Sequence, residues 1–514
     1  MFNENSKKKN ILLSSSIGVI EQIIVYVSQF IFRTIFLMVL TKEYLGITGL
    51  FSNVLQIFSL AELGIGGVIG YRLYKPVKEN DIEKCAQLLR FYKHVYYIIA
   101  LIVFFIGCIY FPFISFTIAD INEVPADINI NLIYWLFVIQ NVSSYFCVYV
   151  QSLLSADQKN YVLSFGNCIY ILCSYIFKII FLFIFRNYTI VLSTGIVINI
   201  LYNIIIASYI KRKYKTVFNS KTNNIIREEK IQIFKDTGAM MCHKVGYVIV
   251  NGTDSIILSK FIGIGVLGLY SNYQMISVAI DAVLGKMLGS FVSTIGNFSV
   301  DATSDEKYNI YKPLLFLNMW IASFCSICYF VLIEPFITIW LGQDFLLSTS
   351  VAIIISLNIF FNSSRIISGS FVSAVGMFVK DKVRPLIQAL LNLIISIVLV
   401  IKIGIVGIFI GTLLSSLLTV WWREGYLLYK NLFNKNVFNY YLYYLFWFLI
   451  TIIVSLLFWW ICKFIPVTIW GVVLQFIICI FGINIFYCII FWKNKNFQFF
   501  KNLLISKIKR RNSK

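Results

Sequence analysis

The sequence predicts an all-α polytopic membrane protein with about fourteen transmembrane helices. Of its 514 residues, 59% are hydrophobic and 13% are charged, whereas a soluble domain has about 25% charged residues. The apolar residues form many long runs, and a helix that crosses a bilayer needs about 20 such residues. These runs lack the alternating pattern of about ten residues that marks a transmembrane β-strand.

The apolar runs and the polar breaks between them define the expected spans. They lie near residues 11–40, 46–71, 94–115, 129–154, 161–184, 188–210, 236–261, 264–291, 313–339, 348–375, 385–401, 404–422, 438–462 and 467–492. The first run follows three lysines but continues past the length of a signal peptide and contains charged residues, so we interpret it as a membrane helix.

The basic residues predict the orientation of the chain. The sequence has 44 Lys and Arg against 23 Asp and Glu, a formal net charge of +21. With a cytoplasmic N-terminus, 34 of the 44 bases fall in the N-terminal segment, the even-numbered connections and the C-terminal tail. This is the positive-inside pattern of membrane proteins. We therefore expect both termini to be cytoplasmic, and no nucleic-acid partner.

An internal repeat links the second and eighth spans. Residues 49–53 read GLFSN and residues 268–272 read GLYSN. The same spacing of 219 residues pairs Glu62 with Asp281, and it pairs two small-residue GxxxG patterns that allow close helix packing. Weak internal symmetry of this kind is typical of transporter folds.

Six spans separate the two copies, so the two halves have the same orientation in the membrane. We expect two parallel six-helix lobes around a central cavity, with two helices appended. The predicted boundaries are 1–215 for the N-lobe, 216–435 for the C-lobe, and 436–514 for the last two helices and the basic tail.

Polar residues form a stripe on one face of spans 1 and 7. The stripes consist of Ser15, Gln22, Gln29 and Arg33, and of Thr237, Lys244, Asn251 and Ser255, both with spacings of 7, 7 and 4. That spacing places each set on one helical face. Because a polar face is unfavourable against lipid, we expect Gln22, Gln29 and Asn251 to line the cavity. Interhelical hydrogen bonds that only pack the bundle are the alternative, which we prefer for Ser and Thr.

Ionisable residues inside spans need a structural or functional reason, because each is unfavourable by about 2.5–3.5 kcal/mol on insertion scales. They are Glu21, Arg33, Glu62, Lys178, His243, Lys244, Asp254, Asp281, Lys286, Glu334 and Arg365. Lys178 and Glu334 lie toward predicted outer helix ends, where extension of the side chain to the interface is a sufficient explanation.

Arg33, Lys244 and Arg365 are the strongest candidates for binding an anion. Arginine stays charged and binds phosphate through two parallel hydrogen bonds, which suits a diphosphate in a confined cavity. Asp254 lies close enough on span 7 to pair with Arg33 in the absence of substrate, and a permanent structural pair is the alternative.

Gating or ion coupling is predicted for a second group of charged residues. Glu62, Asp281 and Lys286 lie in the cytoplasmic halves of their spans and are gate or anchor candidates. His243 titrates near neutral pH, so it fits a coupling role as well as a simple hydrogen-bonded one.

Motifs for metal, cofactor or ATP binding are not found in the sequence. Cys325 and Cys328 form a C-x-x-C inside an apolar run without a second pair, so we expect helix packing rather than zinc or redox chemistry. A phosphate-binding loop is also missing. Energy would then come from an ion gradient, with proton or sodium both open, from the membrane potential, or from use of the product.

Several short motifs resemble bacterial polysaccharide-unit flippases. The first half contains IFRT at 31–34, EYLG at 43–46, GLF at 49–51, AELGIG at 61–66 and YKP at 74–76. The second half contains HK at 243–244, NGTD at 251–254, SKFIG at 259–263, GLYSN at 268–272, RP at 384–385, Asn392 and the segment 404–412. The chain resembles Wzx-type members of the multidrug/oligosaccharidyl-lipid/polysaccharide (MOP) exporter superfamily over nearly its whole length.

The resemblance implies a fold like that of multidrug exporters and a bacterial plasma-membrane location. It implies movement of undecaprenyl-diphosphate-linked sugar units to the outer leaflet by alternating access. The partners would be the lipid-linked glycan, membrane lipids, and polymerases and glycosyltransferases of the same pathway. The alternatives are a multidrug or cation exporter of the superfamily, a membrane glycosyltransferase or polymerase, and a passive scaffold. The longest outer connection, 113–130, contains three acids but no His or Arg, which argues against an enzyme.

Overall fold

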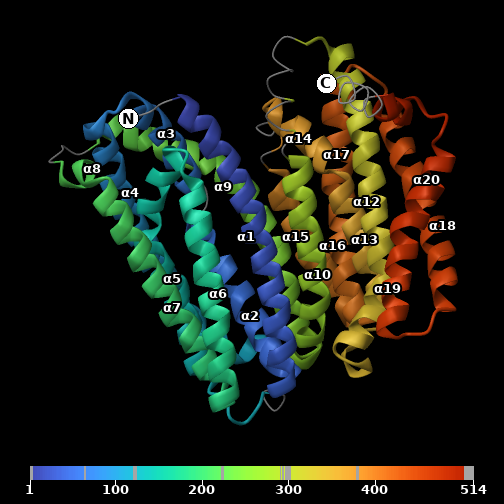
Figure 1. Ribbon diagram of the computed structural model, residues 1–514, viewed down its shortest axis with the longest axis horizontal. Helices are drawn as coiled ribbons and strands as arrows, with labels where there is room; N and C mark the ends of the chain where they lie inside the picture. The colour runs from blue at the N-terminus through green and yellow to red at the C-terminus, as the bar shows by residue number, and fades with distance from the viewer. Residues whose placement is uncertain are drawn as a thin grey trace. The chain divides into compact units, whose positions relative to one another are not determined.

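The computed structural model is helical throughout the part of the chain that it describes, which comprises residues 4–62, 65–119, 124–220, 225–289, 291, 295, 302–377, 381 and 383–502 (Figure 1). Its contacts divide the chain into two compact units, Met1–Gly268 (unit 1) and Leu269–Lys514 (unit 2). The lobe boundaries expected from the repeat stay a prediction.

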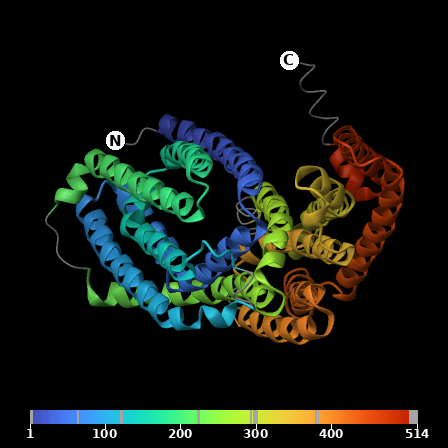
Figure 2. The same cartoon turned by 90° about the horizontal axis from the view of Figure 1, so that it is seen from below.

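Unit 1 is a bundle of long helices joined by short connections. Its helices are α1 (Glu4–Val39), α2 (Lys42–Phe58), α3 (Ile65–Glu79), α4 (Ile82–Tyr110), α5 (Ile130–Ala156), α6 (Asn160–Phe185), α7 (Tyr188–Lys213), α8 (Lys215–Asn219) and α9 (Arg227–Phe261). Side-chain caps begin three of them, because Asp81, Asn129 and Asn187 each accept the backbone N–H three residues later. Helix α1 lies beside α6 in both views (Figures 1 and 2).

Unit 2 has more interruptions in its helices. They are the rest of α10 (Ile264–Gly289), which begins in unit 1, and α12 (Ser304–Trp340), α13 (Thr349–Ser364), α14 (Ile366–Ala374), α15 (Arg384–Ile403), α16 (Ile405–Ser416), α17 (Trp422–Gly425), α18 (Phe438–Lys463), α19 (Ile469–Ile478) and α20 (Asn484–Ile490). Three π-helical segments join neighbouring helices: Leu417–Trp421, Tyr426–Leu432 and Cys479–Ile483. Large aromatic side chains fill the core, among them the fully buried Trp447, Tyr440 and Tyr487.

The all-helical membrane fold predicted from the sequence is confirmed. Eleven helical segments of the described chain are long and apolar enough to cross a membrane. The other three expected spans correspond to α9, to α10, and to α2 with α3. Residues Ser59–Glu62 form a 3₁₀ turn that interrupts the predicted span 46–71. The count of fourteen is compatible with these helices.

Apolar side chains cover the outside of many helices, as expected where helices face lipid. Trp470 and Ile469 at the start of α19 are 82% and 68% exposed, and Ile453 on α18 is 61% exposed. Exposed apolar surface of this extent is unusual on a soluble monomer. It fits a multi-pass membrane protein, in which lipid covers these faces.

The N-terminal ends of α2 and α10 cross at two glycines within unit 1. A Cβ atom on Gly46 would overlap the carbonyl oxygen of Ile264, and a Cβ atom on Gly268 would overlap that of Lys42. Gly268 is the first residue of the second copy of the sequence repeat. The close approach of the Lys42 carbonyl explains why this residue is a glycine. Small residues of this kind allow helix backbones to approach closely.

We expect Gly268→Ala to destabilise the protein by about 1–3 kcal/mol, the usual range for overpacking a tight contact. The matched control is Gly285→Ala on the same helix, where an added Cβ meets nothing within 4 Å. Alanine has the higher helix propensity, so the control should be neutral or slightly stabilising. The melting temperatures of both variants can be measured by thermal unfolding in detergent. Equal melting temperatures would contradict the close approach of α2 and α10 at Gly268.

Candidate functional site

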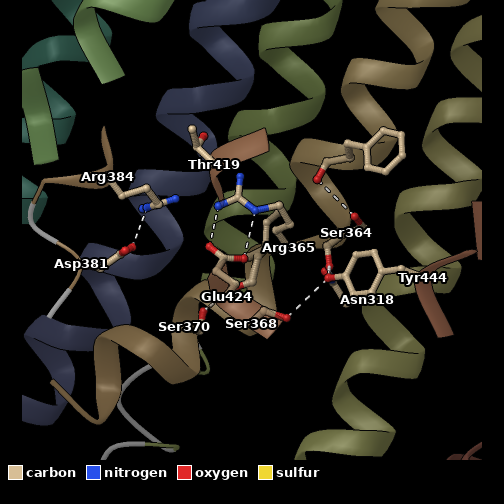
Figure 3. Close-up of polar contacts among 12 residues, drawn as sticks. Asn318, Ser364, Arg365, Ser368, Ser370, Asp381, Arg384, Thr419, Glu424 and Tyr444 are labelled. Atoms are coloured by element: carbon tan, nitrogen blue, oxygen red, sulfur yellow. Dashed lines mark hydrogen bonds and ion pairs between the residues drawn. The ribbon is translucent and has the colours of Figure 1, made fainter. Parts of the chain in front are cut away.

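A break between α13 and α14 places Arg365 at the centre of a polar cluster in unit 2 (Figure 3). Just before the break, the hydroxyl of Ser364 donates to the backbone carbonyl of Phe361 at 3.2 Å, a local bond that competes with the helical pattern. The carbonyl oxygen of Ser364 accepts hydrogen bonds from the amide of Asn318 and from the hydroxyl of Tyr444, the latter at 3.1 Å. Side chains from α12 and α18 thus satisfy a carbonyl group at the break.

Arg365 forms a two-point ion pair with Glu424 of α17. Its Nε donates to Oε2 at 3.0 Å, and one terminal nitrogen donates to Oε1 at 2.5 Å. The Glu424 side chain is only 6% exposed. Because a buried charge is unfavourable without a partner, the guanidinium and the carboxylate each stabilise the other's charge at this position.

A second buried acid lies beside this pair. Asp381, between α14 and α15, contacts Arg384 at 2.5 Å and Arg423 at 3.5 Å, and its side chain is 4% exposed. The cluster therefore contains three arginines and two carboxylates. These five side chains together carry an excess of one positive charge.

The π-helical segments on both sides of α17 mark the same place. Segments of this kind are rare and often occur at functional sites. Gly425 follows Glu424, and a Cβ atom there would lie 2.5 Å from a ring carbon of Tyr440. The glycine thus lets the Tyr440 ring of α18 pack directly against the short helix that carries Glu424.

The sequence predicted Arg365 as a cavity ligand, and this role stays a prediction. Its carboxylate partner, Glu424, was missed because it lies two residues beyond the predicted end of its span and next to Arg423, which made the segment look like a loop. The available signal in the sequence was the adjacent base and acid, Arg423 and Glu424, directly after two tryptophans. An anion that binds Arg365 would have to compete with Glu424.

In unit 1, the predicted polar face of α1 lies partly against α6. Arg33 is next to Tyr175 of α6, and Asn167 of α6 donates to Glu21 at 2.6 Å. Gln22 and Gln29 are half-buried. Glu21 is not one of the four residues of the predicted stripe, so both the cavity roles of the two glutamines and the packing alternative stay predictions.

The matched acids Glu62 and Asp281 have different surroundings. Glu62, at the end of the 3₁₀ turn, accepts a hydrogen bond from Tyr96 at 2.8 Å, and Tyr92 donates to Tyr96 at 3.2 Å. Asp281 lies on an exposed face of the continuous helix α10, where Ser363 donates to it at 3.3 Å. The local structure around the two acids therefore differs, and their equivalent role as gate or anchor residues stays a prediction.

The remaining predicted residues lie on α9 and α10. Asp254 is buried, and the neighbouring Ser255 accepts a hydrogen bond from Asn53 of α2 at 2.9 Å. Lys286 is exposed near the end of α10. His243, Lys244 and Asn251 belong to α9, but their side chains lie outside the described residues. Gating or coupling by these residues stays a prediction.

Each unit has a buried aspartate at an equivalent connection. Asp157, between α5 and α6, contacts Lys159 at 2.5 Å and accepts a hydrogen bond from Tyr214 at the end of α7. Burial and this bond to Asp157 raise the pKa of Tyr214. In unit 2, Asp381 likewise contacts a base shortly after it, Arg384. It also contacts Arg423 of α17, beyond the π segment that follows α16. The two aspartates tie corresponding helix ends together.

An almost wholly apolar groove of about 540 Å³ lies in unit 2 between α10, α12 and α19. Ile276, Phe324, Tyr329, Phe336, Val472 and Phe476 are among its lining residues. Cys325 and Cys328 also line it as free thiols. A groove of this composition can hold a hydrocarbon chain but offers nothing to a charged group.

We expect Glu424→Ala to destabilise unit 2 by about 3–5 kcal/mol, because Arg365 would be left buried without its carboxylate. The matched control is Asp305→Ala, which removes a carboxylate that contacts Lys435 at 2.8 Å but is 75% exposed. Exposed pairs contribute little, so the control should keep its melting temperature. Equal effects of the two substitutions would show that the buried pair has no special structural role.

The family comparison matches more than half of the chain. Residues 9–292 match the family model described as "Polysaccharide biosynthesis protein". No curated protein matches the sequence.

Solved structures of transporters share the fold. The lipid II flippase MurJ in an inward closed conformation superposes with a TM-score of 0.66 at 14% identity, covering 94% of this chain and 99% of MurJ. An inward-facing MATE multidrug transporter of the MOP superfamily gives a TM-score of 0.58 at 13% identity, covering 79% of this chain and 95% of that one. The Vibrio cholerae MATE transporter VcmN gives 0.53 at 12% identity, with 85% and 100% covered.

These structures are transporters and flippases, in agreement with the expectation of a transporter rather than an enzyme. The fold and the family match also agree with the resemblance found in the short motifs. The chain belongs to the polysaccharide biosynthesis protein family and has the fold of the MOP exporter superfamily.

Proposed function

We propose that this protein flips undecaprenyl-diphosphate-linked oligosaccharide units across the bacterial plasma membrane by alternating access, for capsule, exopolysaccharide or O-antigen synthesis. The family match over residues 9–292 carries this proposal. The similarity in fold to a lipid II flippase over 94% of the chain supports it.

The chemistry of the helices suits an amphiphilic substrate. A lipid-linked sugar diphosphate has a long hydrocarbon chain and an anionic head group. The apolar groove of unit 2 fits the hydrocarbon chain, because the lining of the groove is nearly free of polar atoms. The anionic head group would be bound by Arg33, Lys244 and Arg365, since an anion taken from water needs charge-assisted hydrogen bonds in place of its hydration.

Exchange of partners would make the bases available only when substrate is present. Arg365 is neutralised by Glu424, and an arriving diphosphate would compete with this carboxylate for the guanidinium. We propose the same exchange for Arg33 and Asp254. Such an exchange keeps the charge compensated in both states and can bias a two-state helix arrangement.

A multidrug or cation exporter is the second candidate, because several of the similar structures are MATE transporters. A cavity for cationic drugs would be dominated by acids. Transport of a cationic dye and of a lipid-linked oligosaccharide by the same purified protein separates the two candidates. An ion gradient, with proton or sodium as the coupling ion, would supply the energy in either case.

We expect reconstituted vesicles to expose undecaprenyl-diphosphate-linked oligosaccharide at the opposite leaflet, measured with a membrane-impermeant glycosidase. Arg33→Ala should lower the rate at least about tenfold through loss of a charge-assisted hydrogen bond. Arg186→Ala, at the end of α6, is the control and should leave the rate unchanged. Dye transport without oligosaccharide transport would favour the drug exporter, and an unaffected Arg33→Ala variant would remove Arg33 from the binding site.

Both termini should lie in the cytoplasm, given the distribution of basic residues. Single cysteines in a cysteine-free variant at positions 3, 123, 223 and 513 can be labelled in intact cells with an impermeant maleimide. We expect labelling at position 123 alone. Labelling at position 223 from outside would contradict the proposed orientation.

A further inference from the structure

Lys178 of α6 is a membrane-embedded base that the predicted sites do not use. Its Nζ lies 5.4 Å from the ring centre of Tyr175 and 5.8 Å from that of Phe32 on α1. The sequence suggested that this side chain extends toward the interface. The structure instead directs it across the bundle toward α7.

A glycine of α7 makes room for this lysine. A Cβ atom on Gly195 would overlap Cε of Lys178 and would lie 2.8 Å from Nζ. Lys178 is seven residues before the last residue of α6, and Gly195 is seven after the first residue of α7. At a rise of 1.5 Å per residue, both positions are about 10 Å from their helix ends. The ammonium group therefore lies beside Gly195, about two helical turns from the ends of α6 and α7.

Among the residues that the structure describes, no carboxylate lies within 4 Å of Lys178, and its ammonium group contacts the faces of two aromatic rings. Lys178 is half-buried, and a cation over a ring gains about 0.5–2 kcal/mol, less than an ammonium group loses when apolar surroundings replace its hydration. The group needs an anion when the helices are in the membrane.

A second base lies close by. Arg33 of α1 interacts electrostatically with Tyr175, whose ring Lys178 contacts. The ring of the preceding residue, Phe32, packs on Tyr175 at 5.2 Å between ring centres, so this turn of α1 lies against α6. Tyr175 thus interacts with a base from α1 and a base from α6, and the space beside Gly195 accommodates the lysine.

We propose that Lys178 and Arg33 form a binding site in unit 1 for the diphosphate of a lipid-linked substrate. The lysine supplies a point charge with three donors, and the arginine supplies a planar set of donors that matches phosphate geometry. This assignment rests on the proposed function, because it takes the head group of that substrate as the anion. Lys178 is a substrate-binding residue in this arrangement, and Gly195 positions it.

The test measures binding of undecaprenyl diphosphate to the purified full-length protein in nanodiscs of phosphatidylcholine. Lys178→Met should weaken the affinity about 10- to 100-fold, the usual range for a hydrogen bond to a charged group. Lys178→Arg should retain most of the affinity. Gly195→Ala should weaken binding through displacement of the lysine, although alanine favours the helix.

Lys93→Met is the matched control, because Nζ of Lys93 also lies 5.4 Å from a tyrosine ring, that of Tyr97. This variant should bind like the wild type, and melting temperatures confirm that each variant is folded. Wild-type binding that is insensitive to Lys178→Met and Gly195→Ala would overturn the site but leave the proposed function intact. A wild type that binds no undecaprenyl diphosphate would overturn both.

Nanodiscs that contain phosphatidylglycerol distinguish the source of the phosphate. We expect this lipid to compete weakly, because it carries a single phosphodiester charge. If it displaced undecaprenyl diphosphate at equal concentration in the wild type but not in Lys178→Met, the site would belong to a membrane phospholipid and the substrate assignment would be wrong.

Discussion

Compensation of charge inside apolar helices is the constraint on which much of unit 2 depends. The Arg365–Glu424 pair is the clearest case, because both side chains are largely buried and joined at two points. The break before Arg365 and the π segments around Glu424 interrupt regular helices at the places where these two residues must meet. Irregular backbone at membrane depth is tolerated only where the protein satisfies it, and here Asn318 and Tyr444 do so.

The helical architecture was predictable from the sequence because hydrophobicity decides it locally. The long apolar runs form helices, although the run at 46–71 is divided by a 3₁₀ turn. The glycine that opens the second GL[FY]SN copy is also the one at which α10 crosses α2. Breaks inside helices were not predictable. The turn at Ser59–Glu62 and the π segments depend on contacts between helices distant in sequence, such as Tyr440 against Gly425.

The candidate site was predictable only in part for a related reason. Intramembrane bases are visible as charges in apolar runs, so Arg33 and Arg365 stood out. Their partners are set by tertiary structure. Glu424 lay beyond the predicted end of its span, and the direction of Lys178 depends on the space beside Gly195 in the next helix, which periodicity does not encode.

The two units treat their charges differently, although they share a repeat. At the connections, the chemistry is retained, since Asp157 and Asp381 each contact a following base. Within the helices, two bases that the repeat does not pair have different surroundings: Arg365 pairs with the carboxylate of Glu424, whereas Lys178 contacts aromatic rings. A pair that is already compensated can respond to an anion only by exchange, which favours a role in switching. A base held over rings can accept an anion directly, which favours a role in binding. These different surroundings are the reason for proposing separate tasks for Arg365 and Lys178.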